Sequence, residues 1–318
     1  MSMRISTQQL YNGGTSGIQR LQSEVYTLQN QVDTGRRIVT PKDDPVGAAQ
    51  VLVVTQTQAV NELYIKNQQT ATTKLGALDN VLGGVGDELK NIYDNALAAG
   101  NGSYSDSERA AVASELAERL KNLVSLANSQ DGTGRYIFSG FQSTTTPFAL
   151  SANASPYSLS NGYMNYSGDD GVQTLQVSAS QNLETSVPGS EVFMRVKDAA
   201  GNVTGRSMFD AVQNMVNFLK TPGASASSAT YTQALGDITA SMDNVLTVRA
   251  AVGSKLSSLE TISNMAADQK LQYKEQLSNL EDLDYASALT SVSQKKLQLD
   301  AAMASFTLTS KLSLFDYI

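Results

Sequence analysis

Adjacent carboxylates are the residues of this sequence that could do chemistry, because two neighbouring acids can share a proton in acid–base catalysis. They stand at Asp43–Asp44, Asp169–Asp170 and Glu281–Asp282. The 318 residues contain no histidine and no cysteine. The chain therefore lacks the commonest general base at neutral pH, the commonest metal ligand and any thiol nucleophile. We expect no catalytic residue, metal or cofactor, and interpret the three pairs as cap, turn and exposed helix charges.

A second charged group lies in TGRRIVTPKDDPVGAAQ, at positions 34–50. Two prolines break any continuous helix through this stretch, so it predicts a hinge between two helices. Asp44 followed by Pro45 is typical of an N-cap and a first helical residue. Two interpretations stay open: an ion-pair network that fixes the hinge, or a solvated turn. The predicted hinge residues are Arg36, Arg37, Pro41, Asp43, Asp44 and Pro45.

The hinge must be positioned by the helices on either side of it. Before it, five apolar residues recur at spacings of three and four, which predicts a helix with a heptad seam. They are Ile18, Leu21, Val25, Leu28 and Val32, and Gly35 is a good helix stop. After it, a longer seam predicts the internal core of a helical bundle, formed by Leu75, Leu78, Leu82, Val85, Leu89, Ile92 and Ala96.

The run after residue 285 is apolar on two sides of a helix. One face carries Leu289, Val292, Leu299, Met303 and Phe306; the other carries Leu297, Leu308 and Phe315 and is extended by Leu312. A single partner helix covers one face, so the second face predicts burial against another chain. We predict an assembly interface made of the seam at 18–32 together with Leu289, Val292, Leu299, Met303, Phe306, Leu308, Leu312 and Phe315.

The middle of the chain has a different character, with Gly, Ser, Asn and Asp between short runs rich in Tyr and Val. NYSGDDGVQTLQV (165–177) predicts two strands and a turn, and EVFMRVKDAAGNV (191–203) a strand and a turn. The fold class is therefore mainly α with an inserted small β domain, in an elongated helical bundle whose terminal helices pair as a coiled coil. We predict three domains: 1–44 with 285–318, 45–142 with 206–284, and 143–205. The bundle should fold without the insert.

Composition limits the partners. The net charge is −7, the pI is near 4.7, and no run of basic residues exceeds a pair, so we expect no nucleic-acid partner. No run of about 18 apolar residues occurs, so we expect no membrane span. No cleaved signal peptide is recognisable. The protein should therefore stay in the cytoplasm or leave by a route that needs no cleaved signal.

Four segments carry a resemblance to a known family. They are TGRRIVTPKDDPVGAAQ (34–50), GRYIFSGFQSTTTPF (134–148), VRAAVGSKLSSLE (248–260) and the closing stretch 280–318, which ends in SLFDYI. The chain resembles the bacterial hook–filament junction proteins, the hook-associated protein 3 family of the flagellin superfamily. The resemblance implies a flagellin-like fold and export through the flagellar type III apparatus with an export chaperone. It also implies a ring of identical subunits outside the cell, between the preceding hook-associated protein and flagellin, with terminal helices lining a tube.

Two other classes of protein compete with this interpretation. The first is flagellin, which shares the patterns at both ends. The paired prolines, the GRYIFSG stretch and the SLFDYI ending favour the junction protein instead, and long filaments formed by the chain alone would favour flagellin. The second is an enzyme. The metalloprotease insert of some flagellins needs an HExxH motif, which a chain without histidine excludes.

Overall fold

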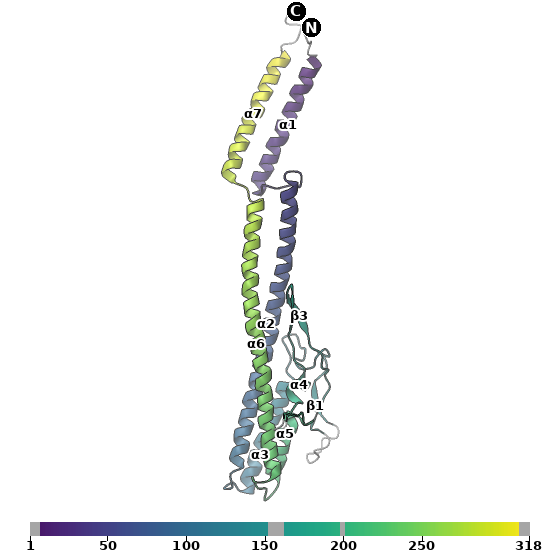
Figure 1. Cartoon of the computed structure of the whole chain (residues 1–318), viewed down its shortest axis with the longest axis vertical. Helices are drawn as coiled ribbons and strands as arrows, with labels where there is room; N and C mark the ends of the chain where they lie inside the picture. The colour runs from purple at the N-terminus through teal and green to yellow at the C-terminus, as the bar shows by residue number, and fades with distance from the viewer. Residues whose placement is uncertain (1–6, 152–161, 198–200, 312–318) are drawn as a thin grey trace, which may run out of the picture. The chain divides into compact units, whose positions relative to one another are not determined.

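The protein is mainly helical, with a small β region inserted between its helical halves. The computed structural model describes residues 7–151, 162–197 and 201–311 (Figure 1). Within them the helices are α1 (Thr7–Thr34), α2 (Pro45–Ala99), α3 (Asp106–Ala127), α4 (Gly189–Phe193), α5 (Met208–Lys220), α6 (Ala229–Glu281) and α7 (Tyr285–Lys311). The strands are β1 (Phe148–Leu150), β2 (Met164–Tyr166), β3 (Thr174–Ser178) and β4 (Gln181–Glu184). The predicted fold class is confirmed.

The chain divides into two compact units. We call residues 1–62 with 268–318 the terminal unit, and residues 63–267 the central unit. Helices α2 and α6 contribute residues to both. The insert belongs to the central unit together with the helices around it. The three domains drawn from the sequence, with their boundaries, stay a prediction.

Helix ends follow the local sequence chemistry. Ser105 caps α3 in a capping box, in which Glu108 donates its backbone N–H to the serine and accepts from the N–H of Ser105. α1 is followed by Gly35, which has a φ of 67°, a conformation that glycine adopts without strain. α2 begins at Pro45, directly after Asp44. The ends at Gly35 and Pro45 were predicted from the sequence.

The core of the central unit contains the long seam of α2. All seven of its predicted residues, from Leu75 to Ala96, are buried. The same cluster contains residues of the helices that pack around α2, among them Leu116 and Leu120 of α3 and Val245 of α6. The interpretation of this seam as internal core is confirmed.

The insert forms two separate hairpins. β1 pairs antiparallel with β2, placing Phe148 opposite Tyr166, and β3 pairs with β4. The stretch 165–177 does supply two strands, β2 and β3, but they belong to different sheets. The strand predicted from residue 191 is wrong, because this segment is the short helix α4. Val192 and Phe193 are buried there, so packing overrides their preference for strands.

A cluster of phenylalanines joins the insert to the helices. The ring of Phe193 lies 5.0 Å from that of Phe138, 5.1 Å from that of Phe148 and 5.6 Å from that of Phe209 on α5, measured between centroids. All four rings are at most 2% exposed. The insert and the bundle therefore share one core. The shared core leads us to predict, contrary to our expectation from the sequence, that the bundle depends on the insert to fold.

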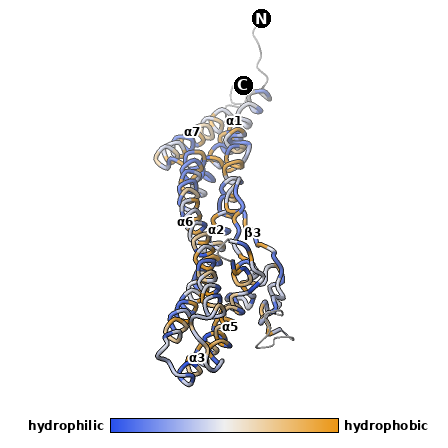
Figure 2. Tube along the Cα trace, turned by 60° about the horizontal axis from the view of Figure 1, so that its bottom comes forward, coloured by the Kyte–Doolittle hydropathy of each residue, from blue (hydrophilic) through white to orange (hydrophobic). Residues whose placement is uncertain are grey.

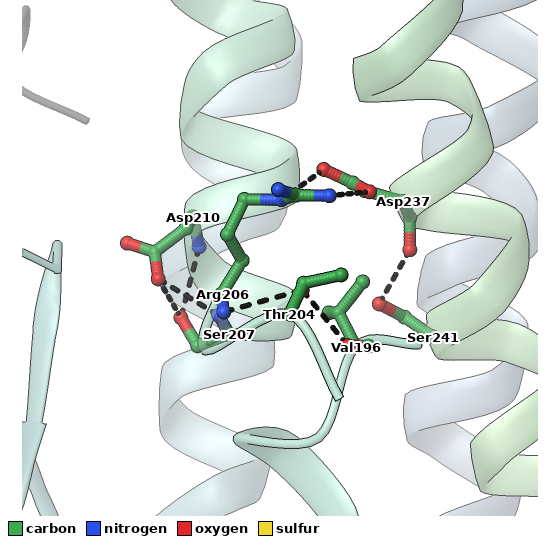
Figure 3. A network of polar contacts seen from close by, with 7 residues as sticks. All are labelled: Val196, Thr204, Arg206, Ser207, Asp210, Asp237 and Ser241. Carbon is green, nitrogen blue, oxygen red and sulfur yellow. Dashed lines mark hydrogen bonds and ion pairs between the residues drawn. The ribbon is translucent and has the colours of Figure 1, made fainter. Parts of the chain in front are cut away.

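Polar contacts fix the segment where the chain returns from the insert (Figure 3). The guanidinium of Arg206 donates from Nε and Nη2 to the two carboxylate oxygens of Asp237 on α6, each at 2.8 Å. Ser207 and Asp210 form a capping box at the start of α5. Asp210 also accepts from the backbone N–H of Tyr163 in the insert, at 2.5 Å. The return segment is thus held to α5, α6 and the insert.

Replacing Arg206 by methionine should destabilise the central unit by about 2–4 kcal/mol. The Asp237 side chain is only 7% exposed, so its carboxylate would be left buried without its bidentate partner. Thermal unfolding followed by circular dichroism would measure the loss. Arg195→Met is the matched control, because Arg195 and Glu191 are both about half exposed and 4.0 Å apart. Equal melting temperatures for the two variants would contradict the prediction.

Candidate assembly site on the terminal helices

In the terminal unit, α1 and α7 lie side by side and antiparallel, with polar and apolar residues alternating along both (Figures 1 and 2). The predicted seam of α1 is covered: Val25 is buried, and Ile18, Leu21, Leu28 and Val32 are half-buried. On α7, Ala288 is buried and Val292, Leu299 and Phe306 are half-buried. These side chains are therefore largely used to hold the pair together within one chain. Their role in assembly stays a prediction.

Phe306 is held by two residues that the sequence analysis missed. Its ring lies edge-on to that of Tyr11, with centroids 4.9 Å apart. A Cβ at Gly14 would lie 2.5 Å from the Phe306 ring, so glycine is required for this close approach. The spacing could have shown it, because Gly14 precedes Ile18 by four residues and so continues the seam. The structure therefore places Phe306 against its own chain.

An ion pair also crosses between the two helices. Lys295 Nζ lies 2.7 Å from Glu24 Oε2, and Arg20 lies one turn before Glu24 on α1. The hydrogen bond from Lys295 holds the pKa of Glu24 below its usual value. A half-exposed pair adds little stability, but it favours one register of the antiparallel helices.

The other side of α7 stays uncovered in the single chain. Leu297 is 70% exposed and Leu308 67%, and at 100° per residue they lie about 20° apart around the helix. Leu289 and Met303, at the edge of the covered face, are also exposed. Leu312 and Phe315 lie outside the described residues. The predicted α7 set is thus divided into residues packed on α1 and residues that face outward.

Arg37 is the centre of the contacts in the predicted hinge segment. Its backbone N–H donates to the carbonyl of Glu281 at 2.6 Å, and its Nη2 donates to the carbonyl of Leu280 at 2.9 Å. Its Nη1 pairs with Asp44 Oδ2 at 3.2 Å. Arg36 lies 3.7 Å from the carboxylate of Glu281. These contacts tie the segment between α1 and α2 to the end of α6.

The turn itself is built by the two aspartates. Asp43 accepts hydrogen bonds from the backbone N–H and the hydroxyl of Thr40, and Asp44 accepts from the N–H of Gly47 in the first turn of α2. Pro41 and Pro45 are exposed, while Ile38 is buried. Gly47 is needed here because a Cβ would lie 2.6 Å from Ile38 and 2.5 Å from Asp44. Whether this turn acts as a hinge stays a prediction.

Acid should loosen this turn. The N–H of Thr40 lowers the pKa of Asp43, and the N–H of Gly47, with Arg37, lowers that of Asp44. Groups with a lowered folded-state pKa stabilise the fold above the unfolded value, near 3.9, and lose that effect as pH falls through the folded value. Hydrogen-exchange protection of residues 38–48 should therefore be constant from about pH 5 to 8 and fall below about pH 4.

Asp44→Asn is the control for the acid prediction. Asparagine is also a good N-cap, so the start of α2 should remain, but the charge that pairs with Arg37 is gone. The variant should show reduced protection at neutral pH and a smaller further loss in acid. An unchanged acid response in this variant would show that Asp44 does not carry the effect.

The adjacent carboxylates are engaged by the chain's own donors. Asp169 accepts from the backbone N–H groups of Phe141 and Gly171, each at 2.8 Å, and Asp170 accepts from the hydroxyl of Ser190. Asp43 and Asp44 accept hydrogen bonds in the turn before α2, and Glu281 at the end of α6 pairs with Arg36. Across residues 7–151, 162–197 and 201–311 there is no group of three acidic side chains placed to bind a metal ion. No helix in those ranges is long and apolar enough to cross a membrane.

Comparisons with known proteins agree with this architecture. Residues 5–143 match the family described as the bacterial flagellin N-terminal helical region. Flagellar hook-associated protein 3 of Salmonella typhimurium is 33% identical over 98% of this chain and 99% of its own length, and that of Escherichia coli is 32% identical over the same shares. The crystal structure of hook-associated protein 3 from Legionella pneumophila covers 72% of this chain and 98% of its own, with a TM-score of 0.63 and 21% identity.

The family match identifies a protein with a flagellin-type N-terminal helical region. The two relatives narrow the class to hook-associated protein 3. The identity to two curated relatives extends over nearly the whole of each chain. The chain belongs to the flagellar hook-associated protein 3 family.

Proposed function

We propose that the chain is a structural subunit of the bacterial flagellum that joins the hook side to the flagellin filament. The observation that carries the proposal is the apolar outer face of α7, formed by Leu297 and Leu308. A monomer gains nothing from exposing leucines at these positions, whereas an assembled ring would bury them. Membership of the hook-associated protein 3 family favours this role over that of flagellin.

The finer parts of the proposal concern partners and place. Copies of the chain associate with one another through the terminal helices, with the preceding hook-associated protein on one side and flagellin on the other. An export chaperone accompanies the chain before it leaves the cell without a cleaved signal, and the junction lies outside the cell. We assign it no catalytic role, because the adjacent carboxylates serve as caps, turns and ion-pair partners.

Electron microscopy of the chain alone, and of hooks given the chain, flagellin or both, would test the proposal. The chain alone should form no long filaments. Hooks that carry the preceding hook-associated protein should gain an extra layer on addition of the chain, and should then be extended by flagellin. Long filaments from the chain alone would identify it as a filament subunit instead. Extension by flagellin with no need for the chain would contradict the junction role.

A further inference from the structure

The terminal unit contains an apolar groove that residues 7–62 and 268–311 leave open. It lies between the first turns of α2 and the last turns of α6 and has a volume of about 810 Å³. Pro45, Val46, Ala49 and Val53 line it from α2, and Leu280 lines it from α6. Val46 and Val53 are more than half exposed. A groove of this size can hold several apolar side chains.

The lining indicates what kind of occupant fits. All nine lining residues are uncharged, and three exposed amides, Gln50, Gln276 and Asn279, stand among them. Amide side chains can both donate to and accept from the backbone of a bound segment. The groove therefore suits a short peptide that has apolar side chains and little charge.

Residues 312–318 of this chain have that composition. The segment LSLFDYI contains five large apolar or aromatic residues and a single acid, Asp316. It follows Lys311, the last residue of α7. It is also the most apolar stretch of the closing run.

Distance excludes the groove of the same copy. The backbone N–H of Leu283 donates to the carbonyl of Gly35, and that of Arg37 donates to the carbonyl of Glu281. These hydrogen bonds hold the start of α7 beside the end of α6, which lines the groove. The 27 residues of α7 span about 40 Å, and the contact of Phe306 with Tyr11 places its far end beside the start of α1. Seven extended residues reach at most about 25 Å, so they cannot return to their own groove.

We propose that residues 312–318 of one copy bind the groove formed by Pro45–Val54 and Gln276–Leu280 of another copy. The inference rests on the proposed self-association and names the segment and the surface that make the contact. Such head-to-tail contacts are heterologous, so they lead to rings or stacked layers rather than to closed dimers.

Cross-linking would test the contact, since the natural chain has no cysteine. Val53→Cys in one preparation is mixed with Phe315→Cys in another under mild oxidation. A disulfide forms only when the two Cβ atoms come within about 4.5 Å. Leu52→Cys is the matched control: Leu52 is 69% exposed and Val53 62%, but Leu52 does not line the groove. The Val53 pair should cross-link at least about tenfold faster than the Leu52 pair.

Three results would overturn the inference. They are equal rates for the two pairs, no cross-link for the Val53 pair, and rapid closure within a dilute single chain that carries both Val53→Cys and Phe315→Cys. As a second measurement, a labelled peptide of residues 310–318 should bind Leu52→Asp like the wild type and Val53→Asp at least about tenfold more weakly. Failure of these tests would leave the junction role intact, because electron microscopy of hooks tests that role separately.

Discussion

A chain that lacks residues 145–202, closed by a short Gly/Ser link, should lose the cooperative unfolding of its central unit. The deletion removes Phe148 and Phe193, so the rings of Phe138 and Phe209 become exposed at a cost of about 1.5–3 kcal/mol each. It also removes the strand backbone to which Gln68 donates from its buried side chain. These losses approach the total stability of a typical domain, about 5–15 kcal/mol. Thermal unfolding followed by circular dichroism would measure the effect.

Two phenylalanine variants test whether the loss of stability comes from the shared core or from the deletion itself. Phe193→Ala should cost about 3–5 kcal/mol, because its ring is fully buried among the other rings. Phe141→Ala should cost less than about 1 kcal/mol, because its side chain is 66% exposed. If the deletion variant melts cooperatively at the wild-type temperature, the insert is a separable domain after all.

The sequence predicted the helices well because their patterns are long. The seams of α1 and α2 each repeat over several turns, and Gly35, Pro45 and Ser105 mark ends by chemistry that acts within a few residues. Such local rules apply whatever else the chain contacts. The boundaries of these helices could therefore be predicted from the sequence alone.

The insert was predicted less well because its short elements depend on distant contacts. The segment at 189–193 has strand-forming residues, yet it is a helix in which Val192 and Phe193 are buried in the core. Nothing in the local pattern shows that Phe148 would contact Phe209, 61 positions further along the chain. The pairing of Arg206 with Asp237 is likewise invisible until α5 and α6 are packed.

The sequence analysis placed the apolar residues of α7 on two faces, but it did not show which side chains cover the first face. Periodicity placed Phe306 among the apolar residues of α7, but it could not show that Tyr11 and Gly14 cover its ring. The residues best suited to test assembly are therefore those that the single chain leaves exposed, Leu297 and Leu308.

The double variant Leu297→Asp, Leu308→Asp should fold normally and fail to assemble. Both positions are about two-thirds exposed, so the monomer solvates the new carboxylates and should keep its wild-type melting temperature. An assembled ring would have to bury two carboxylates per subunit, at several kcal/mol each or with raised pKa values. In a strain that lacks the native protein, the variant should leave cells non-motile and flagellin shed into the medium.

Three further variants identify the cause. Gln298→Asp adds a charge at an exposed position about 80–100° around α7 from the two leucines, and it should support motility. Phe306→Asp should weaken the pairing of α1 with α7, seen as lost hydrogen-exchange protection along both helices, because its ring packs on Tyr11. Leu78→Asp should unfold the central unit, because that side chain is 1% exposed.

If the double leucine variant restores motility, the outer face of α7 is ordinary surface and the subunits associate elsewhere. If it instead melts as early as Leu78→Asp, the two leucines stabilise the monomer itself.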